Sequence, residues 1–313
     1  MTIKKGLVFL IAAMLIVFTG CDNNSSTSTG AGKAFIGGTQ GLVLGFIDGA
    51  PPREVFDTSS DFSVSIRMEN VGEFAVDSNS VQNMPVLKIT GVDPADFGHS
   101  GELRTIITEE LMGTSMDAQG NIIQGTMYTV DFPETGGLQY GKEVSGSVTF
   151  NLRANLCYEY GTKAQAKLCV REDLLGTKGK AAACNVNEEK RVENSGAPIQ
   201  ITSLKESVMG KNKISFMFKI SHVGSGRVYQ QGLSPACDAS SYANKDKVWV
   251  EVTSPDLGQM TCSGLKDGAS TASGDGKVTG YTTLYNGERS IMCNIEIPDS
   301  LSLIHISEPT RPY

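Results

Sequence analysis

Apolar and polar residues alternate one by one along much of this chain, and that period of two limits what it can fold into. The alternation recurs in the segments 62–69, 144–158, 164–170, 214–220, 248–252 and 291–297. Clusters of Gly, Asn, Asp, Ser and Pro separate these segments, as is typical of turns. Because successive side chains of a β-strand point to opposite faces, each segment predicts a strand with one buried face. The sequence therefore predicts an all-β protein.

Two neighbouring segments are expected to pair. The alternation of 144–158 is followed, after a turn near 160–162, by that of 164–170. We therefore predict one long hairpin over 144–171. The segment 102–112 fits a short helix or a strand, and both remain open.

An internal repeat favours two related domains. The segment 62–72, FSVSIRMENVG, aligns without gaps with 214–224, ISFMFKISHVG, and both end in Val-Gly. Alternatively, any two amphipathic strands share this parity. The charged and Ser/Gly/Pro-containing stretch 186–200 is the natural boundary. We predict one β-sandwich domain over 40–195 and a second over 196–300.

Both repeat segments resemble the opening strand of immunoglobulin-like and CARDB-like surface modules, in which such a strand ends in Asn-x-Gly. Here the ends read Asn-Val-Gly and His-Val-Gly. The runs GGTQGL at 37–42 and APP at 50–52 also resemble the lead-ins of archaeal envelope proteins with such domains. The resemblance implies two tandem Ig-like sandwiches, each of two packed sheets, and does not indicate a function.

The N-terminus has the features of a secretory signal. Lys4 and Lys5 precede the uncharged apolar run 7–18, which is shorter than the roughly 20 residues that span a bilayer. The run ends in FTGC at 18–21, which resembles a lipobox except that Phe replaces the usual Leu. The resemblance implies a lipoprotein signal peptide over 1–20, a Cys21 carrying acyl chains such as palmitate, and a polar tether over 21–39. The alternative is an ordinary cleaved signal in which Cys21 is incidental.

The C-terminal residues 301–311, LSLIHISEPTR, resemble a translated sequencing adapter. We therefore exclude the tail 301–313 from the fold and from function. The expectation is that the native chain continues past Ser300 and that the second domain is truncated.

The cysteines predict disulfides. Of the seven, Cys21 is assigned to the lipid, and an exported chain with six others is expected to oxidise them. A zinc site is the disfavoured alternative, because no Cys-x-x-Cys or Cys/His cluster has ligand spacing. The six candidates are Cys157, Cys169, Cys184, Cys237, Cys262 and Cys293.

Position along the strands suggests pairs. Cys157 and Cys169 lie on opposite arms of the predicted hairpin and form the first expected pair. Cys293 lies in the last predicted strand and Cys262 follows a Pro-Asp-Leu-Gly turn, and these two form the second expected pair. The remaining two could bridge the domains or pair elsewhere, and these are Cys184 and Cys237.

Few residues are suited to catalysis or to metal binding. The formal charge of −7 disfavours nucleic acid as a partner. With His305 in the excluded tail, only His99 and His222 remain, and no G-x-S-x-G motif is present. Asp93 and Asp96 could bind Ca²⁺, but without an alternating acidic run they are better interpreted as solvated loop residues. We expect no metal and no cofactor.

Trp249 is the candidate binding residue. It has the opposite parity to the valines at 248, 250 and 252 and is expected to face outward, where an aromatic ring could recognise a partner. Alternatively, it lies under a neighbouring sheet.

These features predict a lipid-anchored envelope protein without enzymatic activity, located on the extracytoplasmic face of the cell membrane or on the cell surface. Its expected role is structural, adhesive or protein-interacting. Its expected partners are the membrane, through the lipid on Cys21, and envelope or surface proteins or glycans. The alternatives are a ligand- or solute-binding lipoprotein and an envelope hydrolase.

Overall fold

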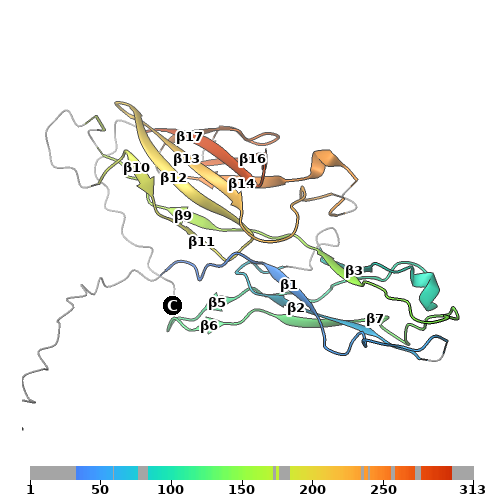
Figure 1. The fold of residues 1–313 in the computed structure, drawn as a ribbon. Helices are drawn as coiled ribbons and strands as arrows, with labels where there is room; N and C mark the ends of the chain where they lie inside the picture. The colour runs from blue at the N-terminus through green and yellow to red at the C-terminus, as the bar shows by residue number, and fades with distance from the viewer. Residues whose placement is uncertain are drawn as a thin grey trace, which may run out of the picture. The chain divides into compact units, whose positions relative to one another are not determined.

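Antiparallel strands form nearly all the regular structure of the computed structural model (Figure 1). It describes residues 33–297 except 59, 77–83, 172–173, 176–183, 234–235, 239, 255–257 and 272–275. Helical turns within this part are the 3-10 segments η1 (Pro94–Phe97) and η2 (Tyr242–Asn244). The predicted signal peptide, Cys21 and the tail 301–313 lie outside the described residues. The prediction of an all-β sandwich fold is confirmed.

Strands β1 to β8 surround a first core. One sheet has the order β1-β2-β7, a second has the order β4-β3-β8, and β5 pairs with β6. Alternate side chains of β2, those of Val64, Ile66 and Met68, are fully buried in this core against Leu87 and Ile89 of β3. The strands are β1 (Leu42–Phe46), β2 (Val64–Asn70), β3 (Val86–Thr90), β4 (Arg104–Ile106), β5 (Ser115–Met116), β6 (Ile122–Ile123), β7 (Met127–Phe132) and β8 (Arg153–Cys157).

Strands β9 to β17 surround a second core. A five-stranded sheet has the order β10-β12-β13-β17-β15, and two-stranded sheets are formed by β14 with β16 and by β11 with β9. Phe216, Phe218 and Ile220 of β13 are buried in this core. The strands are β9 (Ala164–Ala166), β10 (Glu188–Lys190), β11 (Val192–Asn194), β12 (Ile199–Gly210), β13 (Lys213–His222), β14 (Lys247–Thr253), β15 (Gln259–Ser263), β16 (Lys277–Thr283) and β17 (Glu288–Glu296).

The two repeat segments occupy equivalent places in the two sheets. β2 lies between β1 and β7, and β13 lies between β12 and β17, with every pair antiparallel. The glycines that end the segments are also equivalent. A Cβ at Gly72 would lie 2.6 Å from the Gln40 carbonyl oxygen, and one at Gly224 would lie 2.6 Å from that of Thr39. Only glycine permits so close an approach to the segment before β1.

The second core begins earlier in the chain than the predicted domain boundary. Cys169, Leu174 and Val186 all belong to it, although they precede residue 196. The described chain from Ala34 onward forms one compact unit. The division into domains over 40–195 and 196–300 therefore stays a prediction.

The predicted hairpin over 144–171 is wrong. Residues 144–152 form no strand, and the two strands that do form pair elsewhere. Leu156 of β8 lies opposite Leu87 of β3, and Gln165 of β9 lies opposite Glu193 of β11. Alternation identifies the apolar face of a strand, but it does not identify the strand's partner. In the segment 102–112 the structure has the short strand β4 rather than a helix.

Candidate functional site

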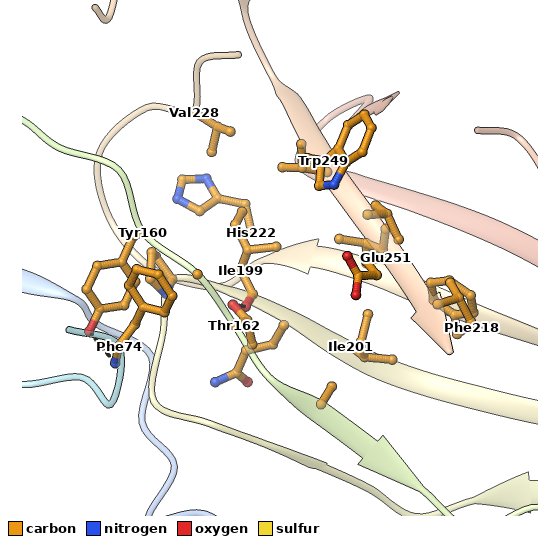
Figure 2. Close-up of a pocket in the computed structure, with 18 of the residues that line it drawn as sticks. Phe74, Tyr160, Thr162, Ile199, Ile201, Phe218, His222, Val228, Trp249 and Glu251 are labelled. Atoms are coloured by element: carbon orange, nitrogen blue, oxygen red, sulfur yellow. Dashed lines mark hydrogen bonds between the residues drawn. The ribbon is translucent and has the colours of Figure 1, made fainter. Parts of the chain in front are cut away.

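Residues of both cores, most of them from the second, line a mainly apolar groove of about 2540 Å³. Strands β12 and β13 contribute Ile199, Ile201 and Phe218, which appear with other lining residues in Figure 2. Strands β9 and β14 also line the groove. It is the candidate functional site because it exposes apolar surface that a sandwich ordinarily buries.

Strand β14 lines the groove with one of its edges. Every residue from Lys247 to Ser254 borders the groove. Because the side chains of a strand alternate between its two faces, an unbroken series of this kind means that the groove runs along the edge of β14. Among the described strands, β14 pairs only with β16. Its second edge is therefore available to pair with another strand.

The β9–β11 ribbon also borders the groove and is fixed to β12. The side-chain N–H of Asn194 donates to the Ile201 carbonyl oxygen at 3.0 Å, and the Ile201 N–H donates back to Asn194 Oδ1 at 2.8 Å. Thr162, just before β9, donates its hydroxyl to the Ile199 carbonyl oxygen. These bonds hold the ribbon in place beside the groove.

Tyr160 and Phe74 also line the groove, with ring centroids 5.5 Å apart (Figure 2). The Tyr160 hydroxyl donates to Asn70 Oδ1 at 2.8 Å and accepts from the Phe74 N–H at 3.3 Å. Burial raises the pKa of Tyr160 to about 12, so its hydroxyl stays protonated at neutral pH. This group acts as a structural hydrogen-bond donor and is poorly suited to general-base chemistry.

A buried ion pair joins β12 to β10 and does not border the groove. Glu206 is 2% exposed, accepts from the Cys169 N–H at 2.9 Å, and lies 3.2 Å from Lys190 Nζ. Burial raises the pKa of Glu206, although the Cys169 N–H and Lys190 oppose this. Burial lowers the pKa of Lys190, but its hydrogen bonds to Glu188 and Glu206 outweigh that effect and raise it overall. Both charges are satisfied by structural partners.

Trp249 lies on β14 and is 39% exposed, on the outward parity that the sequence predicts. Its ring packs edge-on against Tyr281 of β16, with centroids 4.8 Å apart. It also borders the groove. A role in recognition stays a prediction.

All six cysteines in the described chain are oxidised. The expected pair of Cys262 with Cys293 is confirmed. The expected pair of Cys157 with Cys169 is wrong, because the hairpin that would have brought them together does not form. The disulfides are Cys157–Cys237, Cys169–Cys184 and Cys262–Cys293. Cys21 lies outside the described residues.

The structure does not bring the two native histidines together at the groove. His222 ends β13 and borders the groove, whereas His99 follows η1 and does not border it. Asp93 caps η1 by accepting from the Ala95 N–H at 3.0 Å, and Asp96 pairs with Lys142 at 2.6 Å. The described residues contain no cluster of three or more His, Cys, Asp or Glu that could hold a metal ion.

The groove does not follow from the sequence pattern. Val248, Val250 and Val252 are expected on a buried face of their strand, but the structure leaves them only half-buried.

No protein-family model matches the chain, and no curated protein or solved structure is detectably similar to it. Within residues 33–297, as far as they are described, no helix is long and apolar enough to cross a membrane.

Proposed function

We propose that this chain is a lipid-anchored envelope protein that presents β-sandwich surfaces to other molecules outside the cytoplasm. The observation that carries the proposal is the oxidation of all six cysteines of the described chain. Disulfides form and persist in oxidising compartments, so the structure suits an extracytoplasmic environment. The lipobox-like sequence before Cys21 and the polar tether over 21–39 support attachment by a lipid.

The proposed role is structural, adhesive or protein-interacting rather than catalytic. The groove is lined mainly by aliphatic and aromatic side chains, which suit burial against another surface. Two of its polar groups are already bound: Tyr160 donates to Asn70, and Glu251 pairs with Lys277 at 2.7 Å. The proposed partners are envelope or surface proteins or glycans.

Attachment is tested by expressing the full chain and its Cys21→Ala variant in bacteria fed an alkyne-tagged palmitate. We expect label and membrane association for the unchanged chain, and loss of both for the variant. Ser25→Ala, in the same tether, is the matched control and should keep both. A Cys21→Ala protein that still carries label and sediments with membranes would disprove the lipobox interpretation.

A second candidate, a ligand- or solute-binding lipoprotein, is favoured by the groove itself. Its volume of about 2540 Å³, however, exceeds the roughly 300–1,000 Å³ of ordinary small-molecule sites. A thermal-shift screen of sugars, amino acids and fatty acids tests this candidate. A saturable stabilisation that Val250→Asp abolishes and Gln259→Asp, at an exposed position of β15 that does not border the groove, preserves would support it over the surface-presenting role.

A further inference from the structure

We propose that the groove is the docking site of a β-strand that follows Ser300 in the uninterrupted chain and pairs with the edge of β14 that no described strand occupies. This inference goes beyond the proposed function and does not depend on the lipid anchor.

The first point is topological. In the first core, β3 follows the repeat strand β2 and is paired on both edges, with β4 on one side and β8 on the other. In the second core, β14 follows the repeat strand β13 and pairs with β16 alone among the described strands. In the second core, therefore, no described strand occupies the place beside β14 that β8 occupies beside β3 in the first core.

Burial supports the same assignment. On β3, the inward residues Leu87 and Ile89 are 0% and 3% exposed, and Leu87 lies opposite Leu156 of β8. On β14, the inward valines at 248, 250 and 252 are only half-buried. A strand beside β14 would cover them as β8 covers β3, and burying apolar area is worth roughly 25 cal/mol per Å².

The course of the chain leads to the same place. β8 is the next strand after β7, which pairs with the repeat strand β2. β17 pairs with the repeat strand β13 in the same way, and Ile297, immediately after β17, borders the groove. A segment that continues from Ile297 therefore starts at the groove that it would fill.

The chemistry of the groove suits a strand. A free strand edge offers N–H and C=O groups in the strand repeat, and the apolar face beside it accepts alternate side chains. We expect the occupant to be about five to seven residues long, the usual length of a strand. Its apolar side chains should face Phe216 and Phe218 of β13. Residues 301–313, which resemble a translated adapter, would stand in place of the segment that leads to it.

The test begins with the source DNA, sequenced through the codon for Ser300. The frame should continue into an alternating segment at a spacing like that between β7 and β8. The 313-residue chain and the continued chain are then compared by binding of anilinonaphthalene sulfonate, which fluoresces on exposed apolar surface. The 313-residue chain should give a several-fold enhancement that the continued chain loses. The β14 amides should also exchange hydrogen more slowly in the continued chain.

A matched pair of variants separates docking from a general change in folding. Val250→Asp should destabilise the continued chain more than the 313-residue chain, because the residue packs half-buried against the core in the latter and would be covered in the former. Gln259→Asp, at an exposed position of β15 that does not border the groove, should have little effect in either. The proposal is overturned by a continuation without a strand-like segment, or by a continued chain with unchanged dye binding and β14 exchange. It is also overturned if the 313-residue chain is a dimer that binds no dye, because a second copy would then cover the groove.

Discussion

Replacing Asn70 with alanine should lower the free energy of unfolding by about 4 kcal/mol. Asn70 is 0% exposed, and its amide takes part in four hydrogen bonds. Nδ2 donates to the carbonyl oxygens of Phe74 and Leu111 at 2.8 and 2.9 Å. Oδ1 accepts from the Gly72 N–H at 3.3 Å and from the Tyr160 hydroxyl at 2.8 Å. Four bonds at about 1 kcal/mol each give the expected cost.

Urea unfolding followed by circular dichroism measures this loss. With a slope of about 3 kcal/mol per M, a loss of about 4 kcal/mol lowers the unfolding midpoint by about 1.3 M. The control is His222→Ala, at the equivalent place in the second repeat. His222 is half-buried, with no side-chain hydrogen bond to another described residue, so its loss should cost below about 1 kcal/mol.

A double-mutant cycle identifies the source of the effect. Asn70→Ala and Tyr160→Phe remove the same hydrogen bond, so their effects should fall short of additivity by about 1 kcal/mol. If Asn70→Ala costs no more than His222→Ala, the bonds around Asn70 do not stabilise the end of β2, and the reasoning fails.

Three further perturbations follow from the structure. Because the Cys157–Cys237 disulfide joins residues 80 positions apart, replacing both with serine should cost about 4.5 kcal/mol in urea unfolding, and a cost below about 1 kcal/mol would contradict this. The pKa of Tyr160 is about 12, above its ordinary value of 10.0. The contribution of the protonated hydroxyl to the free energy of unfolding is therefore present below pH 10 and is lost as the pH rises toward 12. Tyr160→Phe should flatten that part of the stability–pH curve, and an unchanged slope would contradict it. Glu73 accepts hydrogen bonds from the main-chain N–H groups of Ile36, Gly37 and Gly196. Glu73→Gln should therefore lower the free energy of unfolding by about 2 kcal/mol and increase hydrogen exchange at Gly37. Glu69→Gln on β2 is the control and should do neither.

The features that the sequence predicted correctly depend on short stretches of chain. Alternation located the repeat strands β2 and β13, because the period of side-chain orientation is a property of one strand alone. The disulfide between Cys262 and Cys293 was predicted with only Cys293 placed in a strand, and the structure adds the strand β15, in which Cys262 lies directly opposite Cys293 of β17. The predicted pair was therefore correct, although the strand that carries Cys262 was not predicted.

The features that the sequence did not predict depend on which strands meet. Cys157 and Cys169 have suitable parity for a hairpin, but β8 pairs with β3 and β9 pairs with β11. The partner of Cys157 is Cys237, in the connection between β13 and β14, where no alternation gives a register. The groove was missed for the same reason. The valines of β14 show which face is apolar, but burial also requires a neighbouring strand.

The disulfides explain how a core with an open side can remain ordered. The Cys262–Cys293 disulfide lies within the second core, and the Cys169–Cys184 disulfide is attached to that core through Cys169. The third, Cys157–Cys237, holds Cys237 beside the groove. Cross-links of this kind stabilise a fold largely by restricting the unfolded chain, so they can compensate for apolar surface that stays exposed. No disulfide of the described chain joins two residues of the first core. Reduction should therefore release the amides of β13 to hydrogen exchange before those of β2. The opposite order would mean that packing alone stabilises the second core.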